Sequence, residues 1–162
     1  MPAVIRTRRL ELVPLGEHLA ETIVQTGGTA GLRHAEDYPT DGTLVAAGMV
    51  VTAASEGREL GPFTTYQIIR RSDKAVVGDC GFHSAPDTEG AVVVGYGIAD
   101  SCRGRGYATE ALEALIGFAL LQHGVRRVIA DTSSVNLASR RVMEKAGMRI
   151  VREAANVVYF EA

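Results

Sequence analysis

The sequence predicts one domain of the mixed α/β (α+β) class, with a central mixed sheet flanked by helices, and three observations support this prediction. The chain has 162 residues, about the length of a single domain. Strand-like and helix-like stretches follow one another in the order β, helices, ββ, β, α, β, α, ββ. No repeat, linker or low-complexity segment interrupts residues 1–162, so we expect one domain over that range.

The first half of the chain predicts a strand, two helices and a hairpin. Apolar side chains at alternate positions are typical of a strand with one buried face, and the apolar spacing that follows them indicates a short helix. A glycine-rich stretch, residues 27–31, ends this helix. The polar turn Ser72-Asp73-Lys74 joins two strand-like runs. The predicted elements are strand 10–15, helices 17–25 and 43–55, and the strand pair 64–71 and 76–82.

The second half predicts alternating strands and helices. A long apolar run over residues 91–99 is interrupted by Gly95 and Gly97, which indicates a buried strand with a bulge or a close backbone approach. The next helix carries an amphipathic stripe from Leu112 to Leu120 and is expected to run to about His123. The remaining predicted elements are strand 125–131, a helix that Asn136 opens and Gly147 stops, and closing strands 148–152 and 157–160.

The composition argues against several classes of protein. Seventeen Lys and Arg residues against nineteen Asp and Glu give a net charge of −2, without the basic excess of a generic nucleic-acid binder. No apolar run reaches the ~18 residues that span a bilayer, and residues 1–9 lack the apolar region of a signal peptide. Cys80 and Cys102 form no disulfide framework or CxxC pair, and we expect no metal site. We therefore expect a soluble cytoplasmic protein with no nucleic-acid or membrane partner.

The stretch from Asp100 to Ala111 carries the most informative motif. A buried strand leads into a turn with Gly104 and Gly106, and this turn leads into a helix. Two glycines let the backbone approach a ligand, and the helix start adds unpaired N–H donors with a partial positive charge. Such a turn binds phosphate groups, and arginines in the same loop add full charges. The alternative is an ordinary strand–helix turn that uses glycine for its backbone angles.

Five segments along the chain match the motifs of one family, in the family's order. The loop Arg103-Gly104-Arg105-Gly106-Tyr107-Ala108 fits the pattern Arg/Gln-x-x-Gly-x-Gly/Ala. The other segments are 7–12 (TRRLEL), 77–82 (VGDCGF), 94–98 (VGYGI) and 136–148 (NLASRRVMEKAGM). Together they resemble the GNAT superfamily of N-acetyltransferases, and within it the RimJ/RimL-like branch of ribosomal-protein N-terminal acetyltransferases. Residues 27–60 match none of these motifs.

The resemblance implies that acetyl-CoA binds where two parallel strands, residues 91–99 and 126–132, splay apart. The first of these strands would pair with the pantetheine arm, and the glycine-rich loop would hold the pyrophosphate. Asn136 would contact the pantetheine region or only cap the helix that it opens. The cofactor-binding residues implied in this way are Ile98, Ala99, Arg103, Gly104, Arg105, Gly106, Tyr107, Ala108, Thr109 and Asn136.

Acetyl transfer to an amine needs a neutral amine, a stabilised oxyanion and a protonated or solvated leaving thiolate. In the family, a backbone N–H near Gly97 or Ile98 stabilises the oxyanion. Many relatives protonate the thiolate with a tyrosine, but Met143 stands at that place in this chain. The resemblance to the RimJ/RimL-like branch therefore favours Ser139 as the catalytic hydroxyl, which stabilises the thiolate by a hydrogen bond.

The motifs do not define a general base, because Val93 stands where many relatives carry Glu. Asp79, His83, Glu89 and Asp100 lie nearby in the sequence and are candidates. A water relay, or an acceptor amine of already low pKa, is an equal explanation.

These observations predict an acetyl-CoA-dependent N-acetyltransferase that moves an acetyl group directly onto a primary amine. The acceptor is either the N-terminal α-amine of a protein or a small-molecule amine, and residues 27–60 and 83–90 are expected to decide. The alternative is a catalytically quiet acyl-CoA-binding domain that acts as a sensor or interaction domain, which Met143 and Val93 favour and Ser139 opposes. The oligomeric state is left open between a monomer and a homodimer.

Overall fold

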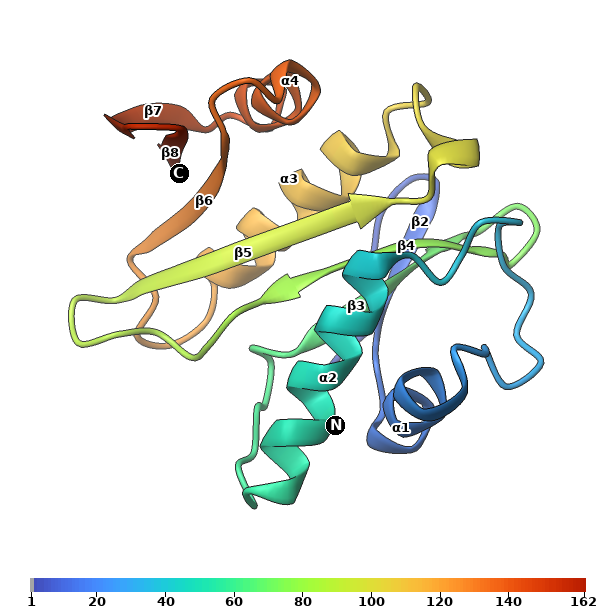
Figure 1. The fold of residues 1–162 in the computed structure, drawn as a ribbon. Helices are drawn as coiled ribbons and strands as arrows, with labels where there is room; N and C mark the ends of the chain where they lie inside the picture. Colours follow the sequence, from blue (N-terminus) through green and yellow to red (C-terminus); the bar gives the residue numbers. More distant parts are fainter. Residues whose placement is uncertain (1) are drawn as a thin grey trace.

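Within residues 2–162, which the computed structural model describes, eight strands form one sheet and four α-helices cover its faces (Figure 1). The strand order is β1-β2-β3-β4-β5-β6-β8-β7; β5 and β6 pair in parallel, and the other neighbouring strands are antiparallel. The strands are β1 (Ile5–Arg6), β2 (Leu10–Pro14), β3 (Thr65–Arg70), β4 (Val76–Phe82), β5 (Ala91–Ile98), β6 (Arg127–Ser133), β7 (Arg149–Ala154) and β8 (Val157–Glu161). The helices are α1 (Glu17–Thr26), α2 (Asp41–Ser55), α3 (Tyr107–Leu120), α4 (Leu137–Lys145) and the 3-10 helix η1 (Asp100–Cys102). The predicted mixed α/β fold is confirmed.

The ends of the helices show where local signals were sufficient and where they were not. Gly27 ends α1 as predicted, with a φ of 65°. Helix α2 begins earlier than expected, because Thr40 and Thr43 form a capping box ahead of it. The expectation that α3 runs to about His123 is wrong. Its last turn tightens after Leu120, where backbone N–H groups bond to oxygens three residues back. The two-residue strand β1 and η1 were not predicted.

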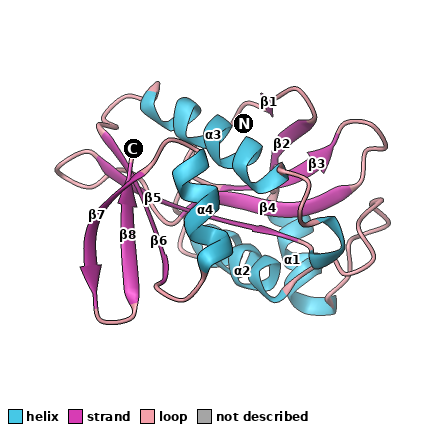
Figure 2. Ribbon diagram, turned by 90° about the horizontal axis from the view of Figure 1, so that it is seen from above, coloured by secondary structure: helices cyan, strands magenta, loops and turns pink. Residues whose placement is uncertain are grey.

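The helices lie in two layers, with α1 and α2 on one face of the sheet and α3 on the other (Figure 2). Leu112 and Leu115 of α3 are fully buried against the strands and form part of the main core. A smaller core joins α1 to α2 through Ile23, Ala47 and Val50. One side of helix α2 therefore packs against α1, and another side lies beside β4 without a helix packed on it.

Strands β5 and β6 diverge after a short parallel stretch. Their ladder pairs residues 91–93 with residues 127–129, whereas β5 continues to Ile98 and β6 to Ser133. The rest of β6 stays paired with β8 on its other edge. The splay implied by the family resemblance is confirmed, and it opens a gap where the two parallel strands end.

Strands β4 and β5 approach each other closely near this gap. A Cβ built on Gly78 would lie 2.1 Å from the Gly97 oxygen and 3.0 Å from Ile98 Cα. The register between the strands runs from Gly78–Ile98 to Phe82–Val94 without a shift. This ladder has no bulge, and the position where a close backbone approach requires glycine is Gly78 of β4, not Gly95 or Gly97 as expected.

Candidate functional site

The loop between β5 and α3 presents a row of backbone N–H groups. Gly104 and Gly106 have φ values of +75° and +80°, which side chains rarely adopt. Gly106 is the N-cap of α3 and has no side chain to satisfy the helix start. The N–H groups of residues 106–109 find no hydrogen-bond acceptor within residues 2–162, and the first intrahelical bond runs from Glu110 N to Gly106 O at 3.1 Å. Four unpaired donors at a positive helix end fit a pyrophosphate, so the residues present fit acetyl-CoA.

The edge of β5 that faces the gap carries Tyr96 and Ile98. The N–H of Ala99 donates to Val77 O of β4 at 2.8 Å, and bonds to one neighbour fall on every second residue of an antiparallel ladder. The backbone groups of Tyr96 and Ile98 therefore point away from β4, toward the gap. The carbonyl oxygen of Ala99 accepts from Cys102 N at 2.8 Å, so both backbone groups of Ala99 bond inside the protein. The Ile98 oxygen accepts from Arg103 Nε at 3.3 Å, so the backbone groups of Tyr96 and the N–H of Ile98 are the groups of β5 left to pair with an extended ligand.

A pair of hydroxyl groups joins β5 to α4. Tyr96 Oη lies 2.7 Å from Ser139 Oγ and 3.2 Å from the Ser139 carbonyl oxygen. Asn136 caps α4 by accepting from the Ser139 N–H at 3.1 Å, which confirms its capping role. Burial raises the pKa of Tyr96, and its hydrogen bond with Ser139 opposes that rise. Met143 is buried in the core, so the tyrosine hydroxyl at this site comes from β5 and not from α4.

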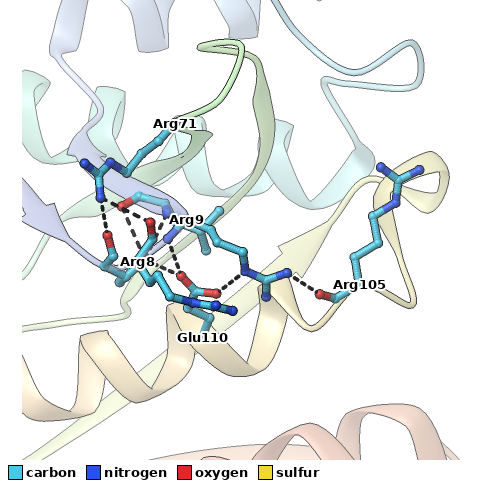
Figure 3. A network of polar contacts seen from close by, with 7 residues as sticks. Arg8, Arg9, Arg71, Arg105 and Glu110 are labelled. Carbon is cyan, nitrogen blue, oxygen red and sulfur yellow. Dashed lines mark hydrogen bonds and ion pairs between the residues drawn. The ribbon is translucent and has the colours of Figure 1, made fainter.

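A polar network fixes the loop between β5 and α3 against the β1–β2 turn (Figure 3). Glu110 accepts hydrogen bonds from Thr7 Oγ1 at 2.6 Å, Arg9 N at 2.8 Å and Arg9 Nε at 2.7 Å. The same guanidinium donates to Arg105 O at 2.8 Å and lies 4.8 Å from the centre of the Tyr107 ring. Burial raises the pKa of Glu110, but the hydrogen bonds from Thr7 and Arg9 outweigh it and lower this pKa overall. The network ties the β1–β2 turn to the loop and to α3.

A cavity of about 290 Å³ lies on the other side of β5, between the sheet and α2. Gly81, Gly95 and Gly97 form its floor, on the same face of the strands as Asp79 and His83. His83 Nε2 would lie 3.1 Å from a Cβ on Gly95, whereas a Cβ on Gly97 would meet nothing within 4 Å. The space above Gly97 is therefore open, with the Asp79 carboxylate beside it.

Asp79 is a buried carboxylate that links three parts of the chain. Its oxygens accept hydrogen bonds from Tyr38 Oη at 3.0 Å and from Thr43 Oγ1. Gln67 Nε2 in turn donates to Tyr38 Oη at 3.2 Å. Burial raises the pKa of Asp79 to about 6, although the hydrogen bonds from Thr43 and Tyr38 act in the opposite direction. A carboxylate with this pKa can exchange a proton near neutral pH.

The structure separates the four candidate bases. Asp79 and His83 line the cavity above Gly97. Glu89 pairs with Arg127 at 3.3 Å and Asp100 pairs with Arg103 at 3.0 Å, and neither carboxylate lines this cavity. Residues 27–60 do contribute to it, since part of α2 forms its wall. From residues 83–90, His83 takes part.

Sequence reasoning missed three residues of the site. Tyr96 lies inside the recognised segment 94–98, but its contact with Ser139 spans 43 residues. Arg9 lies in the segment 7–12, and its contact with Glu110 spans 101 residues. No local pattern pairs residues so far apart, although the position of Glu110 in the first turn of α3 is a usual place for an acid.

The acetyltransferase (GNAT) domain family matches residues 9–149. The chain belongs to this family. The uncharacterized N-acetyltransferase YjdG of Bacillus subtilis (strain 168) is 32% identical over 93 residues, 57% of this chain and 55% of YjdG. The uncharacterized N-acetyltransferase p20 of Bacillus licheniformis is 27% identical over 93 residues, 54% of this chain and 52% of p20. The chain thus matches about half the length of these curated relatives.

Solved structures share the fold over nearly the whole chain. A GNAT-family acetyltransferase from Bacillus anthracis superposes with a TM-score of 0.68 at 21% identity, covering 99% of this chain and 98% of the other. RimL, a ribosomal L7/L12 alpha-N-protein acetyltransferase solved in complex with coenzyme A, has a TM-score of 0.70 at 18% identity, covering 99% of this chain and 97% of RimL. At these identities, the likeness establishes the fold.

The described residues were also searched for membrane spans, metal-binding groups and disulfides. Across residues 2–162, no helix has both the length and the apolar character needed to cross a membrane. In the same residues, no group of three His, Cys, Asp or Glu side chains is placed to hold a metal ion. Cys80 and Cys102 are both buried and unpaired with each other.

Proposed function

We propose that this protein transfers the acetyl group of acetyl-CoA to a primary amine. One observation carries the proposal: the row of unpaired N–H groups at the start of α3 opens onto the gap between β5 and β6. Membership of the acetyltransferase (GNAT) family supports it, as does the coenzyme A in the RimL complex. The pyrophosphate would lie on the loop of residues 103–109, and the pantetheine arm along Tyr96 and Ile98 in the gap.

The two sides of β5 would then serve different steps. Bound in the gap, acetyl-CoA would supply an activated acyl group whose carbon faces the cavity above Gly97. Asp79 accepts the proton that the acceptor ammonium loses, so that its nitrogen can form the new bond. Two N–H groups of β5 point toward the gap: the one nearer the loop can pair with the arm, and the other, nearer Ser139, is placed to donate to the developing oxyanion. As the carbon–sulfur bond breaks, Ser139 donates a hydrogen bond to the thiolate, supported by Tyr96.

Membership of the RimJ/RimL-like branch belongs to this proposal too. Its support is the set of matched segments and the presence of RimL among the structural neighbours. The acceptor is then a protein N-terminal α-amine or a small amine. We also propose a cytoplasmic location, consistent with two buried, unbridged cysteines, and a homodimer as the state to test by sedimentation.

A panel of amines tests the function. The full chain is incubated with acetyl-CoA and with peptides bearing different N-terminal residues, lysine-blocked peptides and small amines, and thiol release is followed. Mass spectrometry then identifies the acetylated product. We expect amine-dependent thiol release, whereas tight acetyl-CoA binding without turnover on any amine would support the sensor domain instead.

A further inference from the structure

Helix α2 exposes large apolar side chains beside the acceptor cavity. The side chain of Val45 is 68% exposed and that of Met49 is 36% exposed. The two residues are one helical turn apart and therefore lie on the same side of α2. Both line the cavity that contains Asp79. An apolar wall thus faces the open space above Gly97.

This wall continues into a second cavity of about 350 Å³. The two cavities share the side chains of Val45, Met49, Thr65, Phe82 and His83. The second cavity is also lined by Leu60, Phe63 and Arg58. A single groove therefore leads from Asp79 along α2 to an apolar far end.

The charges along the groove are asymmetric. Among the described residues that line the two cavities, Asp79 is the one acidic side chain, and it lies at the reactive end. Arg58 lies at the other end and is paired with Glu56 at 2.6 Å. An ammonium group fits beside Asp79, whereas a second ammonium group along the groove would meet apolar side chains that offer it no counter-charge. This arrangement disfavours polyamines.

We propose that the acceptor is a primary amine on a linear apolar body, with the ammonium group at Asp79 and the body along Val45 and Met49 toward Phe63. The inference rests on the proposed acetyl transfer and names its class of acceptor. The apolar body removes the exposed wall of α2 from water, which is the source of its affinity. Val45 and Met49 are then residues that determine specificity, and they take no part in the chemistry.

A series of n-alkylamines from ethylamine to octylamine tests this class, because the amine keeps nearly the same basicity along the series. We expect kcat/KM to rise about fourfold for each added methylene until the groove is filled. Putrescine and spermidine should react more slowly than the alkylamine of equal length. Acetylation that is independent of chain length would overturn the inference and leave the proposed function standing. Absence of acetylation on every amine would instead remove the proposed function.

A matched pair of variants locates the effect on the groove. Val45→Asn removes apolar contact inside the groove, and Leu44→Asn changes a side chain of α2 that is 41% exposed and lies outside both cavities. With octylamine as acceptor, Val45→Asn should lower kcat/KM about tenfold. With ethylamine as acceptor, kcat/KM should change less than about twofold, and so should the affinity for acetyl-CoA. Leu44→Asn should leave both kcat/KM values and the affinity for acetyl-CoA unchanged.

The same variants distinguish a second copy of the chain as the occupant of this face. If sedimentation shows a dimer that Val45→Asn dissociates, the apolar wall is an interface between copies and the acceptor assignment is wrong. If Val45→Asn and Leu44→Asn lower kcat/KM for octylamine equally, the acceptor assignment is also contradicted, because an equal loss indicates that both variants destabilise α2.

Discussion

The two sides of β5 are constructed from different chemical groups. On the side of α3, the groups proposed to bind the cofactor are backbone N–H groups of a glycine-containing loop, fixed by Arg9 and Glu110. On the side of α2, the groups that line the proposed acceptor cavity are side chains such as Asp79 and Val45. Backbone donors serve any chain that keeps the loop conformation, whereas a side-chain pocket changes with each substitution. The motifs therefore cover the loop side of β5, whereas residues 27–60, which contribute α2 to the other side, match none of them.

The largest expected effect is at Asp79, on the acceptor side. Its pKa of about 6 in the folded protein lies above its ordinary value of 3.8, so the folded state holds this proton more tightly than the unfolded state does. The stabilisation from the protonated form is complete below pH 4 and is lost as the pH rises through 6. Relative to Asp79→Asn, the parent should therefore lose up to about 3 kcal/mol of unfolding free energy between pH 4 and 7. Urea denaturation of both proteins across this range measures the difference.

The same variant tests the role of Asp79 in proton transfer. If Asp79 is the base, the parent's kcat/KM should rise to a plateau near pH 6 with two amines of different pKa. Asp79→Asn should lose most of this activity. Profiles that rise with unit slope up to each amine's own pKa would show that the amine loses its proton to water. The two sides of β5 would then differ in binding and not in chemistry.

The next effect is on the cofactor side, at Gly106. Acetyl-CoA at ~100 times its Kd should stabilise the parent by about 2.7 kcal/mol, and Gly106→Asp should abolish this gain. The new carboxylate would lie among the unpaired N–H groups of residues 106–109, where it would repel the pyrophosphate. Because position 106 has a φ of +80°, any side chain there also strains the backbone. Thermal unfolding with and without acetyl-CoA measures the gain.

Gly124→Asp is the control for backbone strain, because Gly124 also has a positive φ of +83° and lies outside the cavities and the loop. It should lower the unfolding temperature yet keep the acetyl-CoA-induced shift. An equal loss of the shift in both variants would remove the special role of the loop.

An intermediate effect is expected where the two sides meet, at Ser139 and Tyr96. Ser139→Ala should lower kcat by about 10- to 150-fold with little change in acetyl-CoA affinity, because the hydroxyl is needed mainly as the thiolate forms. Tyr96→Phe should lower kcat less, and the double variant should lose little more than Ser139→Ala, since the two hydroxyls act as one unit. Steady-state kinetics and calorimetric binding separate these outcomes. A loss confined to binding would make Ser139 a cofactor contact.

The smallest effect is expected at the network that holds the loop. Arg9→Lys keeps the positive charge but loses the forked bonds to Glu110 and Arg105. We expect acetyl-CoA affinity to fall about fivefold, close to 1 kcal/mol, with kcat unchanged. Arg6→Lys is the control, since the exposed Arg6 pairs with Glu11 away from the loop. If the two variants have the same affinity for acetyl-CoA, the network does not contribute to the conformation of the loop between β5 and α3.

Much of the fold, together with the glycine-containing loop and the cap of α4, follows from sequence patterns between residues that are close in the chain. The order of strands and helices comes from apolar periodicity, and the end of α1 comes from Gly27. The loop proposed to bind phosphate turns at Gly104 and Gly106, whose positive φ angles glycine adopts without the strain that a side chain would cause. The capping of α4 by Asn136 spans three residues and is equally local. Each of these features depends on neighbours in the chain, so the sequence by itself determined them.

The tertiary structure decided which distant groups meet. Asp79 looked equivalent to Glu89 and Asp100 in the sequence, and only the packing of α2 on β4 buries it beside Gly97 and raises its pKa. The meeting of Tyr96 with Ser139 likewise depends on how α4 lies across the gap. Burial, and with it the pKa and the role of an ionisable group, is a property of the assembled core. A one-dimensional pattern carries residue types and spacings, but it does not carry the solvent exposure that decides between like residues.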